Sequence, residues 1–236
     1  FKQFSKCLRM GRRANLLGLR RAQKRLVHCT ARRRKTKCCL PYLPSACRVG
    51  LLMHYSREWL IEQIDAGKEF DYLLFYGHKA ATDGSVTASC LSQWFPAEFE
   101  IDGIKYPTAE HYMMAEKARL FNDQDMLKNI LECKTPKEAK ALGRKVQNFE
   151  AEVWQNRCSQ IVVKANLAKF SANPGFTNWL IATAPKVIVE ASMWDKIWGI
   201  GMVASAPGAR DPKLWKGRNL LGFALMEVRD KLTEAK

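Results

Sequence analysis

The sequence predicts an α+β fold, in the form of a single, mainly helical domain with a small β-sheet. Its composition is that of an ordinary globular protein, with 47% apolar and 26% charged residues among 236. From position 107 onward, apolar residues recur about every 3.6 positions over several long segments, which is the spacing of amphipathic helices. Only a few short segments have the composition of strands. Helices are therefore expected to dominate.

The positive charge of the chain is concentrated near its beginning. Residues 1–52 contain 5 Lys and 10 Arg and no Asp or Glu, whereas residues 53–236 have a net charge of only +1. A segment with fifteen positive charges repels itself, and this one has no apolar period that could bury it. We therefore expect residues 1–52 to be disordered and residues 53–236 to form one domain of ordinary size.

Three interpretations of residues 1–52 are open. The segment could be an arm that binds nucleic acid, an Arg-rich organelle presequence, or a stretch that does not belong to the working protein. The first residue is Phe1 rather than Met, and Met53 directly precedes a well-patterned segment. We therefore expect a chain that begins at Met53 to keep its fold and its activity.

A helix and a strand are predicted at the start of the domain. Ser56 is suited to cap a short helix over residues 57–64. Residues 72–76 form an aromatic and aliphatic run that Gly77 ends, as in a buried strand.

A hairpin and a helix follow. Asp102-Gly103 separates residues 99–101 from residues 104–106, which predicts two strands joined by a tight turn. Thr108 can cap the next helix, which the spacing of apolar residues extends to Leu120.

The rest of the chain combines helical patterns with one strand. Pro136 stands where the first turn of a helix tolerates proline. A loop with two Trp and two Gly occupies residues 192–201. The strand is expected over residues 186–190, and helices are expected over residues 123–132, 136–147, 150–170, 176–183 and 219–232.

Two segments combine an acid with aromatic residues. In residues 106–112, Glu110 lies in the first turn of a helix beside His111 and two tyrosines. An acid at this place also offsets the helix dipole, so a purely structural role stays open. In residues 193–201, Asp195 lies between two tryptophans in a loop after a strand. Such loops often hold ligands, although the two indoles could simply pack on the core.

Other catalytic patterns are missing from the sequence. The four histidines have no partners at the spacing of metal ligands. Gly199-Ile200-Gly201 lacks the third glycine and the strand-to-helix context of a dinucleotide-binding motif. Neither a Gly-x-Ser-x-Gly elbow nor a Walker loop occurs. We therefore expect neither a metal nor a redox cofactor.

Hydropathy and cysteines bear on the location of the protein. The most apolar run, residues 180–193, is interrupted by Lys186 and Glu190 and is too short to cross a bilayer. The three cysteines of the domain are isolated from one another. Isolated cysteines are typical of small buried side chains in a reducing compartment, so we expect a cytoplasmic protein without a membrane partner.

Eight motifs stand in unbroken order over about residues 72–232. Each is weakly specific alone, but the ordered set is highly specific. They are Phe75-Tyr76, residues 91–95, residues 106–112, Leu142-Gly143-Arg144, Trp154, Lys169-Phe170, residues 194–199, and residues 217–222 with Met226 and Arg229. Together they resemble the YbiA-like family, also called the NADAR superfamily.

The resemblance implies a YbiA-like fold and an N-glycosidase that needs no cofactor. Some members of the family hydrolyse early phosphoribosyl-amine intermediates of riboflavin biosynthesis, and others remove ADP-ribose from modified guanine. We therefore expect a hydrolase that cleaves the ribose–nitrogen bond of a small phosphorylated riboflavin precursor. The alternatives are release of ADP-ribose from guanine in nucleic acid, and a module that binds ADP-ribose or NAD without turnover. Nucleic acid is otherwise expected as a partner only of residues 1–52, and the oligomeric state stays open.

The resemblance also assigns site residues. It places the family's essential Glu on Glu110 and its loop acid on Asp195, and the division of roles between these two acids stays open. A carboxylate beside the ribose carbon can stabilise its developing positive charge and can deprotonate water. Substrate contacts are implied for Phe75, Trp94, Tyr112, Lys117, Arg144, Trp154, Trp198 and Asn219.

Some of these assignments have a stated chemistry. Trp154 and Trp198 would stack on a base or cover the ribose. Lys117 and Arg144 would hold a phosphate, unless they are solvated surface cations. The chain departs from the family at Ser92-Gln93-Trp94, where an Asn is common at the middle position.

Overall fold

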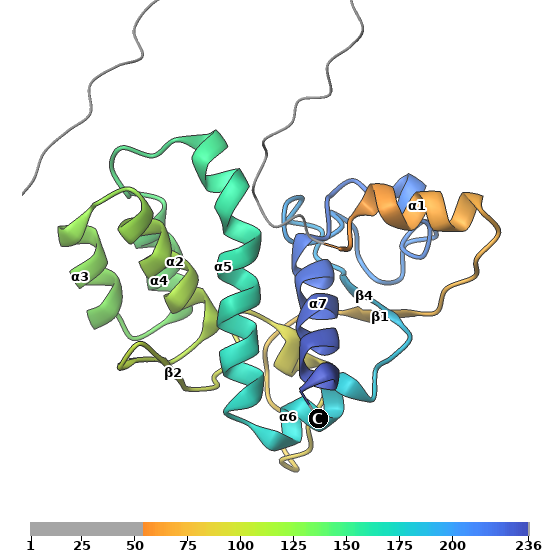
Figure 1. The fold of residues 1–236 in the computed structure, drawn as a ribbon, viewed down its shortest axis with the longest axis horizontal. Coiled ribbons are helices and arrows are strands. Elements are labelled where there is room, and N and C mark those ends of the chain that lie inside the picture. Colours follow the sequence, from red (N-terminus) through yellow and green to blue (C-terminus); the bar gives the residue numbers. More distant parts are fainter. Residues whose placement is uncertain (1–53, 236) are drawn as a thin grey trace, which may run out of the picture. The chain divides into compact units, whose positions relative to one another are not determined.

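Helices dominate the part of the chain that the computed structural model describes, residues 54–235 (Figure 1). Residues 1–52, for which disorder was expected, lie outside the described part of the chain. The helices are α1 (Arg57–Asp65), α2 (Ala109–Leu120), α3 (Gln124–Glu132), α4 (Pro136–Gly143), α5 (Ala151–Ser171), α6 (Pro174–Ile181) and α7 (Leu220–Glu234). The strands are β1 (Tyr72–Phe75), β2 (Phe99–Ile101), β3 (Ile104–Tyr106) and β4 (Val187–Glu190), and the two short 3-10 helices are η1 (Ala88–Leu91) and η2 (Pro212–Leu214). The predicted α+β class is confirmed.

The described strands form two separate pairs. β2 and β3 are antiparallel, with Ile101 opposite Ile104. Asp102 and Gly103 between them have φ angles of 54° and 76°, the left-handed conformation that a two-residue hairpin turn requires. β1 and β4 instead pair in parallel, with Phe75 opposite Glu190. Both strands of this second pair were predicted, but their pairing was not.

Two long helices run side by side through the centre of the domain. α5 and α7 pack against each other, α2 packs on α5, and α3 and α4 pack on α2 (Figure 1). β4 packs on α7 and is joined there by β1. All three apolar residues of β4 are fully buried: Val187, Ile188 and Val189. The core therefore extends from the group around α2 through α5 and α7 to the parallel strands.

The helix predicted over residues 136–147 is shorter in the structure. It begins at Pro136 as predicted, after a capping box in which Thr135 and Glu138 bond each other's backbone N–H groups. It ends at Gly143, whose carbonyl oxygen accepts a 2.8 Å hydrogen bond from Lys117 Nζ of α2. A side chain of another helix thus supplies a donor for a carbonyl oxygen at the end of α4, and no local sequence pattern reveals this contact.

Two further expectations can be compared with the described residues. No helix among residues 54–235 combines the length and hydropathy needed to cross a membrane. Cys90 and Cys158 are buried, Cys133 is partly buried, and all three thiols are unpaired. These cysteines therefore behave largely as the small buried side chains that their isolation predicted.

Candidate active site

The carboxyl ends of β1 and β4 open onto a cavity of about 620 Å³. Because the strands are parallel and in register, the segments that follow them start from the same edge. Gly77 and His78 come directly after β1, and Glu190 and Ser192 lie at the end of β4 and just beyond it. All four line the cavity. The parallel pair thus builds one wall.

A second wall consists of Ser92, Gln93 and Trp94, which follow η1. Two buried residues of α5 hold this segment in place. Lys169 Nζ donates a 2.9 Å hydrogen bond to the Ser92 carbonyl oxygen, and Asn166 Nδ2 donates one of 2.8 Å to Gln93 Oε1. Burial lowers the pKa of Lys169 to about 7. The wall is therefore anchored to the core rather than to the surface.

Glu110 enters the cavity from the first turn of α2. Its backbone N–H donates a 3.0 Å hydrogen bond to the Gln93 carbonyl oxygen, which ties the helix start to the second wall. The residue is 2% exposed, and Oε1 has no hydrogen-bond partner among the described residues. Burial raises the pKa of Glu110 to about 7, although the charge of Lys140 and a hydrogen bond from Trp94 partly oppose this. This carboxyl group can therefore exchange a proton near neutral pH.

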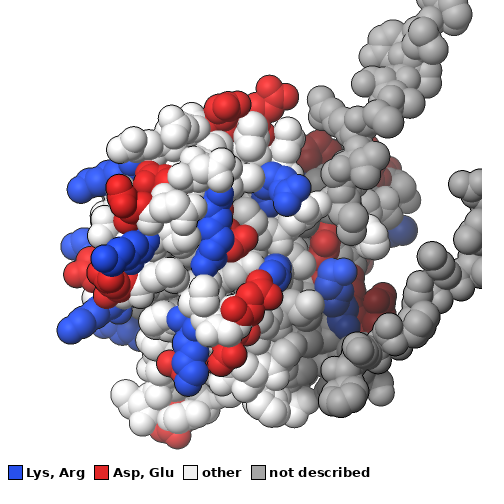
Figure 2. Space-filling model, turned by 60° about the vertical axis from the view of Figure 1, so that its left-hand side comes forward, with Lys and Arg blue, Asp and Glu red and all other residues white. Residues whose placement is uncertain are grey.

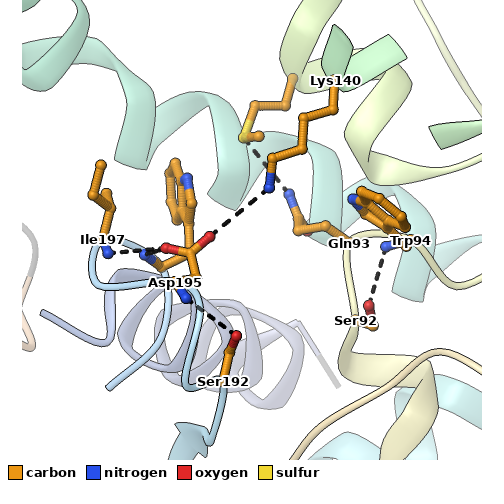
Figure 3. Close-up of polar contacts among 9 residues, drawn as sticks. Ser92, Gln93, Trp94, Lys140, Ser192, Asp195 and Ile197 are labelled. Atoms are coloured by element: carbon orange, nitrogen blue, oxygen red, sulfur yellow. Dashed lines mark hydrogen bonds and ion pairs between the residues drawn. The ribbon is translucent and has the colours of Figure 1, made fainter. Parts of the chain in front are cut away.

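Asp195 lies in the loop after β4 and is held there by backbone hydrogen bonds. Its Oδ1 accepts hydrogen bonds from the backbone N–H groups of Ile197 and Trp198, at 2.9 and 2.7 Å. Its own N–H donates to Ser192 Oγ at 3.2 Å. Figure 3 shows Lys140 reaching toward the same carboxylate, with Nζ 3.9 Å from Oδ2. These contacts fix the loop and the direction of the Asp195 carboxyl group.

Glu190 is a third acid on the cavity wall, and the sequence pattern did not single it out. Its Oε2 atom is sealed from solvent and has no hydrogen-bond partner among residues 54–235. Burial raises the pKa of Glu190 to about 8; the charge of Asp195 adds to the rise and that of Lys140 opposes it. The one available signal was its position, as an acid that ends an apolar strand directly before the Asp195 loop.

A second cavity of about 460 Å³ adjoins the first. It is lined in addition by Lys117 and Trp154. Lys117 Nζ lies 4.1 Å from the ring centre of Phe149 and 5.7 Å from that of Trp154, while it also bonds the end of α4. Residues that line both cavities are Glu110, Met113, Lys140, Arg144, Trp194, Asp195 and Trp198. The two acids predicted to be catalytic therefore stand where the cavities meet.

The structure brings five of the eight predicted substrate-binding residues to these cavities. Arg144 and Trp198 line both of them. The other three line one cavity each: Trp94 the larger, and Lys117 and Trp154 the smaller. Stacking groups and cations thus surround the two acids, as a flat and negatively charged substrate would require.

Three predicted substrate-binding residues line neither cavity. Phe75 is buried at the end of β1, and Tyr112 packs edge-on against Tyr106 with ring centres 5.0 Å apart. Asn219 is fully buried, and its side chain bonds the backbone of β4. These side chains support the walls, and their contact with substrate stays a prediction.

The acids of the cavity do not form a metal centre. Among the described residues, no three His, Cys, Asp or Glu side chains come together in a way that could hold a metal ion. The larger cavity instead combines three carboxyl groups with the indoles of Trp94, Trp194 and Trp198. Such a lining suits a substrate in which a flat group stacks and a nearby carbon becomes positively charged.

Comparisons with known proteins agree with this architecture. A family model described as the NADAR domain matches residues 74–233. N-glycosidase R617 of Acanthamoeba polyphaga mimivirus is 41% identical over 165 residues, which cover 68% of this chain and 95% of the relative. N-glycosidase YbiA of Escherichia coli (strain K12) is 33% identical over 133 residues, covering 56% of this chain and 74% of YbiA.

Two further matches extend the comparison. The riboflavin biosynthesis protein PYRR, chloroplastic, of Zea mays is 35% identical over 138 residues, which cover 56% of this chain and 20% of PYRR. The NMR structure of the E. coli protein YbiA matches with a TM-score of 0.56 and 28% identity, covering 71% of this chain and 88% of that protein. The predicted YbiA-like fold is confirmed. With the family model spanning most of the domain and the mimivirus relative matched over nearly its whole length, this chain belongs to the NADAR domain family.

Proposed function

We propose that this protein is a hydrolase that cleaves the N-glycosyl bond between a ribose carbon and a nitrogen atom. The observation that carries the proposal is the meeting of Glu110 and Asp195, which are far apart in the sequence, on the wall of one indole-lined cavity. Relatives named N-glycosidase within the same family support it.

The reaction uses the different environments of the two acids. Cleavage of the bond builds positive charge on the ribose carbon, and a fixed negative charge beside that carbon lowers the energy of the transition state. Asp195, bonded by two backbone N–H groups and paired with Lys140, supplies that charge. Glu110, whose pKa is raised to about 7, takes the proton of the attacking water.

We assign an early phosphorylated riboflavin precursor as the substrate. Lys140 and Arg144 lie one turn apart on α4 and its C-terminal cap, and both line the larger cavity. Arg144 can receive a phosphate in two-point contact, while Lys140 balances the charge of Asp195. The similarity to a maize protein named for riboflavin biosynthesis supports this choice.

Release of ADP-ribose from guanine is the second candidate activity. The adjoining cavity offers room beyond a single ribosyl-amine. At the mouth of the larger cavity, Trp194 and Tyr76 are 79% and 65% exposed, so each presents an aromatic face to a second base. A module that binds ADP-ribose or NAD without turnover is less well supported, because it would not need three carboxyl groups around one cavity.

The substrate assignment is tested by direct product analysis. The full chain is incubated with phosphoribosyl-amine intermediates of riboflavin synthesis and, separately, with an oligonucleotide that carries ADP-ribosylated guanine. Release of ribose 5-phosphate supports the first activity, and release of ADP-ribose supports the second. Release of neither product contradicts the proposed function.

The role of Glu110 is tested by Glu110→Gln, which keeps the size of the side chain and removes its charge. Because general base catalysis contributes about 10²- to 10⁴-fold, turnover is expected to fall by at least about 100-fold. Glu100→Gln is a matched control, since Glu100 is exposed on β2, and its turnover is expected to equal that of the parent. A Glu110→Gln variant that turns over at the parental rate would show that the assignment is wrong.

We also propose a cytoplasmic location. The unpaired thiols of Cys90, Cys133 and Cys158 suit a reducing compartment. Fractionation of cells that express the natural gene with a C-terminal tag measures the location, and recovery in a membrane or organelle fraction would contradict it.

A further inference from the structure

Glu190 is a partly buried acid that the reaction described above does not use. It ends β4 and lines the same cavity as Glu110 and Asp195. Its Oε2 atom is enclosed and has no hydrogen-bond partner within the described part of the chain. A buried carboxyl oxygen without a partner is costly in a fold, and such groups occur where a ligand or a reaction uses them.

The backbone of Glu190 is held on both sides. Its N–H donates a 2.9 Å hydrogen bond to Asn219 Oδ1, and its carbonyl oxygen accepts one of 2.9 Å from the N–H of Ile200. Asn219 Nδ2 also donates to the carbonyl oxygen of Ile188, at 2.9 Å. A side chain that starts from so fixed a position is preorganised toward the cavity, which a catalytic group requires.

The charges around Glu190 decide which of the carboxyl groups in the cavity keeps a proton. Asp195 on the following loop and Glu110 on α2 act on it as like charges, and Lys140 on α4 acts as the opposite charge. The other charged or titratable groups on the cavity wall are Tyr76, His78, Lys79 and Arg144. Carboxyl groups that share one site do not all ionise together.

The three acids differ in what stabilises their charged forms. Asp195 accepts two backbone N–H bonds and faces Lys140, so its carboxyl group is held at a fixed place in the cavity. Burial raises the pKa of both Glu110 and Glu190, but Lys140 and a hydrogen bond from Trp94 act against this rise at Glu110, whereas at Glu190 the like charge of Asp195 adds to it ahead of the opposing Lys140. Glu110, with a hydrogen-bond donor and an opposite charge beside it, therefore suits the base, and Glu190, beside the charge of Asp195, suits the acid.

We propose that Glu190 is the general acid that protonates the departing nitrogen, an inference that rests on the proposed N-glycosidase function. As the bond between the ribose carbon and nitrogen breaks, its electron pair goes to nitrogen and the proton of Glu190 is transferred to that atom. The oxygen of water bonds to the ribose carbon, and the proton that it loses goes to Glu110. Exchange with solvent then returns a proton to Glu190 and removes one from Glu110.

The test compares pH profiles of turnover for matched variants of the full chain. The parent is expected to show a bell-shaped profile whose alkaline limb reports Glu190. Glu190→Gln should lower kcat by about 10²- to 10⁴-fold and remove the alkaline limb, while the Kd of the reaction product stays within about threefold. Glu190→Asp should keep the limb at a reduced rate, and Glu100→Gln should reproduce the parent.

A second measurement does not depend on turnover. Carbon-13 NMR of protein labelled at the Glu side-chain carboxyl carbon should contain a resonance that titrates near pH 8 and is missing from Glu190→Gln. A resonance that shows Glu190 charged at pH 7 overturns the inference, as does a Glu190→Gln variant that keeps the parental kcat and alkaline limb. If the parent itself releases no product, the N-glycosidase function fails and the general-acid role falls with it. Turnover by the parent with no effect in Glu190→Gln removes only the inference.

Discussion

At the scale of single residues, the surroundings of each acid decide its charge. Asp195 and Glu110 line the same cavity, yet Asp195 receives two backbone hydrogen bonds while Glu110 Oε1 receives none from the described residues. Burial favours the neutral form of the Glu110 carboxyl group, and the charge of Lys140 and a hydrogen bond from Trp94 oppose this only in part. Two similar side chains are thereby prepared for different steps of one reaction.

Glu110→Gln is expected to stabilise the fold at alkaline pH although it lowers turnover. The pKa of Glu110 rises from its ordinary 4.5 in the unfolded chain to about 7 in the fold, so the folded state binds the proton more tightly. Ionisation of Glu110 therefore lowers the free energy of unfolding of the parent. This penalty is absent below pH 4.5, grows as the pH rises, and is complete above pH 7. At pH 8 the free energy of unfolding of the variant should exceed that of the parent by roughly 3 kcal/mol.

Denaturant unfolding of both proteins at pH 8 and pH 5 measures this difference. Most of the gain should disappear at pH 5, because this value lies only half a unit above the ordinary pKa of 4.5 and little of the penalty has built up there. An equal gain at both pH values would mean that the charge of Glu110 is not its cause.

Asp195 offers a test that separates charge from structure. Asp195→Asn keeps the oxygen that accepts from Ile197 and Trp198 but loses the negative charge that faces Lys140. We expect kcat to fall about 100-fold with little change in the Kd of the product, because charge stabilisation acts in the transition state. Asp195→Ala also loses the loop contacts, so product binding should weaken as well. If Asp195→Asn and Asp195→Ala changed the Kd of the product equally, the roles of charge and loop structure would not be separate.

At the scale of elements, the site depends on how α7 meets β4. Asn219, which precedes α7, has a φ of 54° and bonds the backbone of Ile188 and Glu190. Gly222, in the first turn of the helix, approaches the same strand so closely that a Cβ atom would overlap the carbonyl oxygen of Ile188 and the amide of Asn219. The helix can therefore hold β4 in place only with glycine at this position.

Gly222→Ala is accordingly expected to destabilise the fold by about 1 to 3 kcal/mol, as overpacking of a tight contact does. It should also lower turnover, because Asn219 would no longer hold Glu190. Gly175→Ala in α6 is the matched control, since a Cβ there meets only Val86 at 3.7 Å. The control should be neutral or slightly more stable. Denaturant midpoints measure the stability of both variants. A Gly222→Ala midpoint equal to that of the parent would contradict the proposed clash.

At the scale of the whole molecule, charge is divided unevenly along the chain. Residues 1–52 carry +15, and residues 53–236 carry +1. On the face of the domain shown in Figure 2, Lys and Arg side chains are interspersed with Asp and Glu, and no broad area of one sign is visible. This mixture gives that face little attraction for a polyanion.

We therefore expect any affinity for unmodified nucleic acid to reside in residues 1–52. A chain that begins at Met53 should lose salt-dependent binding to a duplex oligonucleotide, while its denaturant midpoint and its turnover equal those of the full chain. Fluorescence anisotropy at several salt concentrations measures the binding. Loss of folding or activity in the shorter chain would show that residues 1–52 belong to the working domain.

Most of the elements could be predicted because their signals are local. The turn at Asp102-Gly103 and the cap at Thr108 lie within a few residues of the structure they specify. The end of α4 was misplaced because the hydrogen bond from Lys117 comes from another helix. Phe75 and Tyr112 were assigned to substrate because they belong to family motifs, although these motifs also preserve the core.

The sequence by itself determined the α+β class, the hairpin, most helix boundaries and the two segments that hold Glu110 and Asp195, because hydrophobic period and turn chemistry act over short distances. Only the tertiary structure decided that β1 and β4 pair in parallel and that Glu190 joins the two acids at one cavity. The pairing of distant strands and the burial of a charge depend on residues far away in the chain. No local pattern carries that information.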